Sequence, residues 1–254
     1  MALTGGHTAD ARDAIARTGT GQDGGLPLRP PGRQVPPSTE MTALDPVLTA
    51  TGIELAYRRG VWPVRHTVSV LRGADLVLGP GEVVGLVGEN GSGKSTLMKV
   101  LIGALTPDAG TVEHTGRLGY CPQTPVVYER LTCDEHFELF GLAYGMTPED
   151  ERRSRRELYA ALGFERYATT RADQLSGGTL AKLNLGLALL ADPHVLLLDE
   201  PYAGFDWDTY LRFWDIVAQR RGAGRSVLII SHFVTDEERF DRIVALRDGR
   251  TVPS

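Results

Sequence analysis

The sequence has few of the features that mark disulfide-stabilised, metal-binding or membrane-spanning proteins. Its 254 residues include two cysteines, Cys121 and Cys133, whose spacing is not that of metal ligands and which suit a reducing compartment. No apolar run approaches the length that crosses a bilayer, and the N-terminus has no hydrophobic signal core. We therefore expect a soluble protein that resides in the cytoplasm.

Lysine is almost absent, and negative charge is in slight excess. The lysines are Lys94, Lys99 and Lys182, arginine supplies the remaining positive charge, and the net charge is −5 at pH 7. A broad surface for binding nucleic acid is not expected from this balance. The hydrophobic content of 42% is enough for one α/β domain, with or without an inserted lobe.

Residues 1–46 lack aromatic side chains altogether, and the first aromatic residue is Tyr57. This stretch holds seven glycines and six prolines, so it cannot bury enough apolar surface to offset the entropy of ordering it. We predict a disordered tail over residues 1–46, with room for a short helix around Thr8–Arg17. A translation start placed too far upstream is the alternative.

What the chain does contain is a phosphate-binding loop pattern. Residues Gly88–Ser95 fit G-x-x-x-x-G-K-[ST], between an apolar strand at Glu82–Val87 and an apolar-periodic helix at Thr96–Ile102. The glycines let the backbone wrap around phosphate oxygens, and the helix start adds its positive dipole end. We expect Lys94 to reach the β- and γ-phosphates and Ser95 to ligate Mg²⁺. A chance match in a glycine-rich turn is the alternative, which the flanking strand and helix disfavour.

Two further patterns are more informative when they are considered together with this phosphate loop. Asp199 and Glu200 follow the apolar strand Val195–Leu198, at the end of the strand where α/β sheets place ligands. One acid there can hold Mg²⁺, and the second can orient or deprotonate an attacking water. Leu175–Gly178 precedes an apolar-periodic helix at Leu180–Leu190, which predicts an N-cap with exposed backbone N–H groups. Alone, the acidic pair is equally consistent with an ordinary strand end, and Leu175–Gly178 would favour a plain helix cap preceded by a turn.

The remaining elements are predicted from local patterns. Residues Ile53–Tyr57 and Thr67–Leu71 alternate in polarity as strands of an antiparallel sheet do. We expect a hairpin over Thr111–Glu113 and Arg117–Tyr120 and a second covered parallel strand at Ser226–Ile230.

Helices are predicted over the middle of the chain and between the two covered strands. Thr132 to Glu135 forms a capping box that opens a helix, Pro148 opens the next one, and a third is expected around Trp207–Arg220.

Together these motifs resemble the nucleotide-binding subunit of an ATP-binding cassette (ABC) transporter. The resemblance covers roughly Val47 to Val252 and rests on the order of the phosphate loop, Gln123, Leu175–Gly178, Asp199-Glu200 and His232. It implies an α/β fold: a P-loop NTPase core with a mostly parallel sheet, an N-terminal antiparallel β-subdomain and an inserted helical subdomain. The implied boundaries are 47–123 and 179–252 for the core and 124–178 for the helical subdomain.

The resemblance also implies a role for each matching position, with ATP and Mg²⁺ as ligands. The nucleotide-binding positions are Tyr57, Gly88, Glu89, Asn90, Gly91, Ser92, Gly93, Lys94, Ser95, Thr96, Gln123, Ser176, Gly177 and Gly178; the Mg²⁺ positions are Ser95, Gln123 and Asp199; the catalytic positions are Lys94, Glu200 and His232.

Some of these roles have particular meanings in the family. Tyr57 matches the aromatic residue that stacks on adenine, with Trp62 as the alternative. Ser176–Gly178 matches the signature motif, which closes on the γ-phosphate held by a second subunit. Asp206 matches the aspartate of the loop at the dimer contact, and His232 matches the switch histidine.

Two departures from the family pattern lie near the implied dimer contact. Thr179 follows the signature where the family usually has glutamine or another long polar residue. The loop Pro201–Asp206 carries tyrosine and phenylalanine where small residues are commoner. Our hypothesis is that the two subunits close, with a rate that these residues tune.

The implied function is that of the ATP-hydrolysing subunit of a bacterial ABC transporter. Its expected partners are a second nucleotide-binding subunit, as a homodimer, and a transmembrane permease that contacts the helical lobe at the inner face of the membrane. The chain stops soon after Arg247–Arg250, and Thr132–Met146 looks like the matching segment of small bacterial export systems, so we expect export. An importer and a regulatory ABC ATPase with weak hydrolysis are the alternatives. A role in translation or repair is disfavoured, because the chain has one cassette and no sustained heptads.

Overall fold

The computed structural model describes residues 45–59, 66–231 and 237–253. The predicted disordered tail falls almost wholly outside these ranges, as do the candidate residues Trp62 and His232. None of the helices in the described ranges is long and apolar enough to span a membrane.

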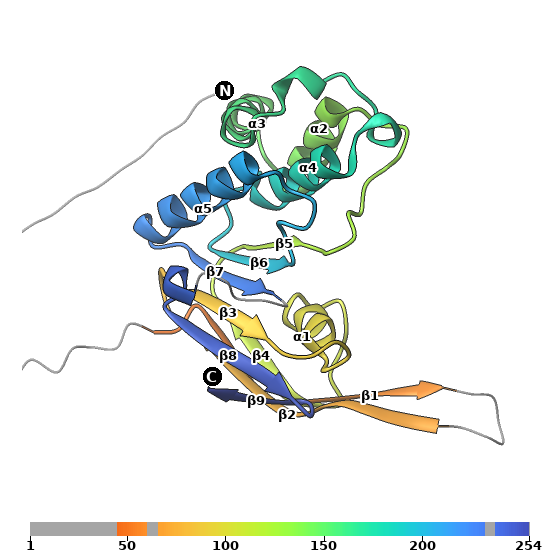
Figure 1. Cartoon of the computed structure of the whole chain (residues 1–254), viewed down its shortest axis with the longest axis vertical. Coiled ribbons are helices and arrows are strands. Elements are labelled where there is room, and N and C mark those ends of the chain that lie inside the picture. The colour runs from red at the N-terminus through yellow and green to blue at the C-terminus, as the bar shows by residue number, and fades with distance from the viewer. Residues whose placement is uncertain (1–44, 60–65, 232–236, 254) are drawn as a thin grey trace, which may run out of the picture. The chain divides into compact units, whose positions relative to one another are not determined.

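The core is a six-stranded sheet in the order β5-β6-β7-β3-β8-β9 (Figure 1). Neighbouring strands from β5 to β8 are parallel, and β9 runs antiparallel to β8. The strands are β3 (Val83–Val87), β5 (Leu118–Cys121), β6 (Val195–Asp199), β7 (Ser226–Ile230), β8 (Arg242–Arg247) and β9 (Arg250–Pro253). All side chains of β6 and β7 are buried, as predicted for parallel strands that are covered on both faces.

Alternate side chains of these strands enter two different hydrophobic cores. Leu197 and Leu228 pack with α1 (Lys94–Leu101) and the N-terminal strands. Leu196 and Val227 pack on the opposite face with α4 (Gly177–Leu189) and α5 (Trp207–Gly222). Successive side chains of a pleated strand point to opposite faces, which explains this alternation. Because both faces are covered by apolar cores, polar residues are found at the strand ends.

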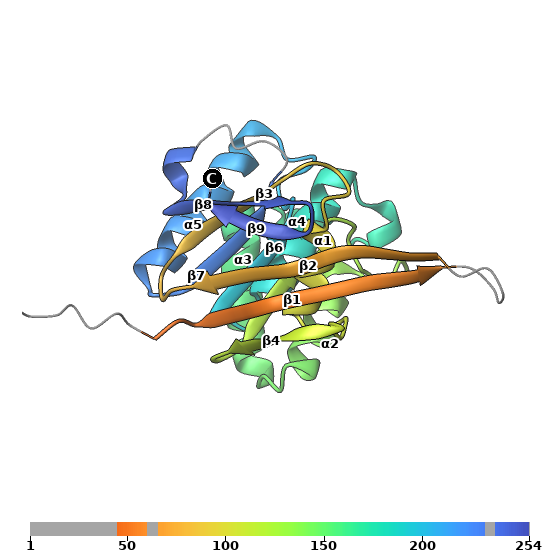
Figure 2. The ribbon, with the colours of Figure 1, turned by 90° about the horizontal axis from the view of Figure 1, so that it is seen from below.

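A second, three-stranded sheet has the order β2-β1-β4 and is antiparallel throughout. Its strands are β1 (Leu48–Arg59), β2 (His66–Leu78) and β4 (Ala109–His114). Figure 2 shows β1 and β2 as long strands that cross the face of the molecule nearest the viewer. The antiparallel prediction is confirmed, although the strands extend well beyond the predicted Ile53–Tyr57 and Thr67–Leu71.

The hairpin predicted over Thr111–Glu113 and Arg117–Tyr120 is wrong. β4 pairs with β1, whereas β5 lies in the other sheet beside β6. Gly116 redirects the chain: its φ is +74°, and a Cβ there would lie 2.5 Å from the imidazole of His194. The backbone N–H of His194 donates to Arg117 O over 2.8 Å, which guides β5 alongside β6.

Helices α2 (Cys133–Ala143) and α3 (Pro148–Leu162) lie between β5 and α4 in the chain and gather at one end in Figure 1. The predicted capping box at Thr132 and the proline at the start of α3 are confirmed. Short 3-10 turns complete the described elements: η1 (Glu165–Tyr167), η2 (Ala172–Gln174) and η3 (Glu237–Arg239).

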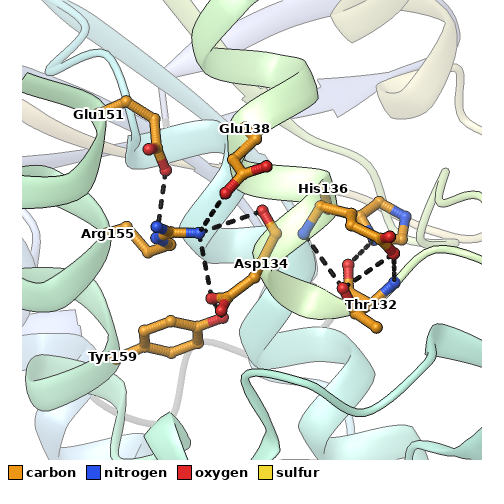
Figure 3. A network of polar contacts seen from close by, with 8 residues as sticks. Thr132, Asp134, His136, Glu138, Glu151, Arg155 and Tyr159 are labelled. Atoms are coloured by element: carbon orange, nitrogen blue, oxygen red, sulfur yellow. Dashed lines mark hydrogen bonds and ion pairs between the residues drawn. The ribbon is translucent and has the colours of Figure 1, made fainter. Parts of the chain in front are cut away.

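One arginine joins α2 to α3 (Figure 3). Arg155 of α3 forms ion pairs with Asp134 at 3.2 Å, Glu138 at 3.3 Å and Glu151 at 3.3 Å. Asp134 also accepts a hydrogen bond from Tyr159 Oη over 2.9 Å. The side chains of Arg155 and Glu151 are both largely buried, so this network lies inside the contact between the two helices.

Candidate nucleotide-binding site

The functional candidates gather at one edge of the six-stranded sheet. Parallel strands end at the same edge, so the segments that follow β3, β5, β6 and β7 are brought together. Those segments begin with Gly88, Pro122, Glu200 and Ser231. The parallel sheet thus brings together the sequence motifs that directly follow these four strands.

The phosphate loop joins β3 to α1 in a conformation that requires glycine. Gly88 has φ +153°, and a Cβ on it would lie 2.5 Å from Leu246 O. Gly93, the N-cap of α1, has φ +106° and supplies no side-chain cap for the first turn of the helix. The first turn of α1 also has no acidic residue, which leaves the positive dipole end suited to a phosphate group.

Lys94 is folded back onto the loop from which it extends. Its Nζ donates to Gly88 O over 2.6 Å and to Glu89 O over 2.9 Å, and the residue is 5% exposed. Burial lowers the pKa of Lys94, while the nearby carboxylates of Glu200 and Asp199 act in the opposite direction. An ammonium group held on neutral carbonyls beside two acids is well placed to turn towards a polyphosphate.

Glu200 and Gln123 are brought into direct contact. Gln123 Nε2 donates to Glu200 Oε2 over 3.0 Å, although the two residues are far apart in sequence. Glu200 has φ +51°, an uncommon conformation for a residue with a side chain, and its N–H donates to Ile230 O of β7 over 3.1 Å. Such a strained backbone geometry is typical of residues with a functional role.

The positions expected to hold Mg²⁺ differ in accessibility. Asp199 ends β6 and is 3% exposed, whereas Ser95 in the first turn of α1 is exposed. Within the described ranges, no group of three or more His, Cys, Asp and Glu side chains forms a metal cluster. A hydroxyl, an acid and an amide suit a hard cation whose remaining ligands are phosphate oxygens and water.

Tyr57 reaches the start of α1 from β1. Its hydroxyl lies 3.4 Å from Thr96 Oγ1, and its ring packs against the hydrophobic core beneath the antiparallel sheet. The structure therefore brings Tyr57 close to the phosphate-loop helix.

The signature residues form the start of α4. Ser176 is the N-cap: its Oγ accepts from the N–H of Thr179 over 3.3 Å, as predicted. The hydroxyls of Ser176 and Thr179 also lie 2.9 Å apart, so the unusual threonine forms a hydrogen bond with the signature serine. A Cβ on Gly178 would lie 2.8 Å from Gly204 O, which places the signature against the loop Pro201–Asp206.

Two contacts in that loop were not predicted from the sequence. Asp206 is the N-cap of α5, where its carboxylate accepts from the N–H of Thr209 over 2.8 Å. Tyr202 Oη donates to Ser231 Oγ over 2.6 Å, linking the segments that follow β6 and β7. The sequence signal for Tyr202 was its departure from the small residues of the family.

A cavity at this edge has a volume of about 1330 Å³. It is lined by the phosphate loop (Gly88–Ser92), Glu200, Tyr202, part of β2 and the turn after β8. The residues that line it do not include Ser176–Gly178, and they do not include Tyr57, Lys94, Ser95, Gln123 or Asp199 either. This cavity is large enough for a nucleoside triphosphate, and the chain's own signature motif does not contribute to its walls.

A family profile described as ABC transporter matches residues 71–203, which is more than half of the chain. This chain belongs to the ABC transporter family. It is 34% identical over 73% of its length to ATP-binding cassette sub-family A member 17 of Mus musculus, of which it covers 11%. It is 32% identical over 75% of its length to Nod factor export ATP-binding protein I of Azorhizobium caulinodans, of which it covers 63%.

Solved structures agree with this assignment. The ATP-binding subunit of an ABC transporter superposes with a TM-score of 0.72 at 28% identity, over 82% of this chain and 90% of that one. A dimeric ATP-binding cassette in a post-hydrolysis state, bound to ADP and phosphate, superposes with a TM-score of 0.74 at 23% identity, over 81% of this chain and 98% of that one. This ABC ATPase thus has the α/β cassette fold predicted from its sequence.

Proposed function

We propose that this ABC ATPase powers a transporter by closing with a second copy of itself around two molecules of MgATP. The observation that carries the proposal is the contact between Gln123 and Glu200 beside the phosphate loop. It places an acid and an amide at the edge where the loop, the strand ends and the large cavity meet.

The chemistry follows from the charges at this edge. Lys94 and the N–H groups of the phosphate loop stabilise negative charge on the β- and γ-phosphates. Glu200 orients a water for in-line attack on the γ-phosphate and accepts its proton. Ser95, Gln123 and Asp199 would hold Mg²⁺, which neutralises phosphate charge when bound. His232 is proposed to contact the γ-phosphate from the segment after Ser231.

A second subunit completes this site in the proposed mechanism. The cavity beside the phosphate loop lacks the signature residues of its own chain, and these lie exposed or half-exposed at the start of α4. Tyr57 is proposed to stack on the adenine, and Ser176–Gly178 to close on the γ-phosphate that the other copy holds.

The helical lobe offers a surface for the permease. Half of the large hydrophobic side chains that are exposed in the described ranges fall between residues 126 and 142: Val126, Tyr128, Leu139 and Leu142. Leu139 and Leu142 lie one turn apart on α2, so they share a face of that helix. We assign the lobe at 124–178 to contact a permease at the inner face of the membrane, through an apolar segment of that partner.

We propose export as the direction of transport, supported by the name of one relative. The relative from Azorhizobium caulinodans is named as a Nod factor export ATP-binding protein. The present chain spans only 10–14% of the sub-family A relatives and 63% of the Nod factor relative, so transport itself is part of this proposal.

Co-expression with a candidate permease, sought among the neighbouring genes, tests this function. The permease should co-purify with the wild-type chain and stimulate its phosphate release. Leu142→Glu should abolish both effects, whereas Leu211→Glu, at an exposed leucine of α5, should preserve them. Equal co-purification with Leu142→Glu would refute the docking surface, and a neighbouring solute-binding protein would argue for import.

A further inference from the structure

The middle of the signature helix carries a buried polar residue that the proposed mechanism does not use. Asn184 lies on α4 and is 7% exposed. Asparagine is a poor helix former, and burying its amide is costly unless the amide is hydrogen-bonded. A residue that breaks local preference in the middle of a long apolar helix is expected to have a specific partner.

Both N–H groups of Asn184 are directed at the end of β5. Asn184 Nδ2 donates to Pro122 O over 2.8 Å and to Cys121 Sγ over 3.1 Å. Burial raises the pKa of the Cys121 thiol to about 12, so the sulfur is a neutral, weak acceptor. The bond to the Pro122 carbonyl is therefore the stronger of the two, and it holds the backbone immediately before Gln123.

Close packing joins the same helix to the same strand at a second point. A Cβ on Gly119 would lie 2.4 Å from Ala188 O, so α4 rests directly on β5. Ser176 caps α4 eight residues before Asn184, a distance of about 12 Å along a helix. α4 is therefore packed on β5 at Gly119 and hydrogen-bonded to the segment after β5 at Pro122.

We propose that Asn184 is a positioning residue that couples the signature helix to Glu200 through Gln123. Asn184 holds Pro122, Gln123 follows Pro122, and the Gln123 amide rests on Glu200 Oε2. Closure of a partner subunit on Ser176 shifts α4 and thereby changes the contact between the glutamine and the base. This inference rests on the proposed function, because it assigns Glu200 the role of base.

A double-mutant cycle tests the coupling. The four proteins are wild type, Asn184→Leu, Gln123→Ala and the double variant, each assayed for kcat, for binding of a fluorescent ATP analogue and for thermal unfolding. Asn184→Leu should lower kcat by about tenfold with unchanged nucleotide affinity, because the base is misplaced rather than removed. In the Gln123→Ala background the same substitution should change kcat by less than about twofold.

Leu187→Ala is the matched control, since Leu187 is buried on the same helix without a polar contact. It should lower the melting temperature while leaving kcat within about twofold of wild type. If Asn184→Leu does not fold, Asn184→Ala takes its place in the cycle. Equal losses of kcat from the Asn184 substitution in both backgrounds, or the same loss in Leu187→Ala, would overturn the coupling. A wild-type chain that does not hydrolyse ATP would instead overturn the proposed function.

Discussion

Gln123 donates a hydrogen bond to Glu200 Oε2 over 3.0 Å, and this contact joins the segments that follow β5 and β6. The glutamine thus occupies one oxygen of the carboxylate that is proposed to activate water. Gln123 lies in the segment that leads from β5 towards α2.

A charge placed at Gln123 should therefore shift the pH dependence of hydrolysis. In Gln123→Glu, two carboxylates would lie about 3 Å apart, which raises the pKa of the pair. Because the base acts in its ionised form, the acidic limb of the kcat profile should move to higher pH. Thr124→Glu puts the same charge on the exposed neighbouring residue and should leave the limb in place. Identical profiles for the two variants would contradict the contact.

Lys94→Ala should weaken ATP binding by about tenfold to a hundredfold, the loss expected for charge-assisted hydrogen bonds. Equilibrium binding of a fluorescent ATP analogue measures it. Lys99→Ala is the control, because Lys99 is an exposed lysine of the same helix. If both variants bind nucleotide as the wild type does, the phosphate loop has no part in binding.

Thr179 should affect turnover through Ser176. Its hydroxyl lies 2.9 Å from Ser176 Oγ, so it restrains the rotamer of a serine that is proposed to bind the partner's γ-phosphate. Thr179→Val removes this bond at nearly constant volume, and Thr179→Gln restores the residue usual in the family. Both should change the steady-state rate of ATP hydrolysis by a few-fold, with ATP affinity at low protein concentration unchanged. Rates equal to wild type in both variants would show that Thr179 has no role.

Arg155→Met should destabilise the helical lobe by about 3 kcal/mol at pH 7, because it leaves the buried carboxylate of Glu151 without its cation. Burial raises the pKa of Glu151 above the ordinary glutamate value of 4.5. The ionised carboxylate therefore lowers the free energy of unfolding as the pH rises above 4.5. The deficit of Arg155→Met should consequently shrink in acid, where Glu151 is protonated. Urea unfolding from pH 4 to pH 8 measures it, with Arg156→Met, an exposed neighbour, as the control. A deficit that does not vary with pH would contradict the role given to Glu151.

The sequence was sufficient wherever a local pattern decides the structure. The capping box at Thr132, the N-cap at Ser176 and the covered strands β6 and β7 were all predicted, because propensity, burial and hydrogen bonding agree there. The hairpin at β4 and β5 was wrong because pairing depends on distant partners, β1 and β6, which neither segment specifies locally.

Some features of the site could not have been predicted from one sequence. The contact of Asn184 with Pro122 and that of Tyr202 with Ser231 join residues remote in the chain. The hairpin of β8 and β9 could have been found, because Asp248-Gly249 is a strong turn signal and both residues have positive φ.

The behaviour of Glu200→Gln in the presence of MgATP is the most direct test of the ATP-sandwich mechanism and of Glu200 as its base. Light scattering with size-exclusion chromatography should show an ATP-dependent dimer that persists, and phosphate release should fall by about a hundredfold or more, because the variant keeps the shape of the side chain but loses the base. Phosphate release at the wild-type rate, or a protein that stays monomeric with bound ATP, would contradict the proposed role of Glu200 and the ATP-sandwich mechanism.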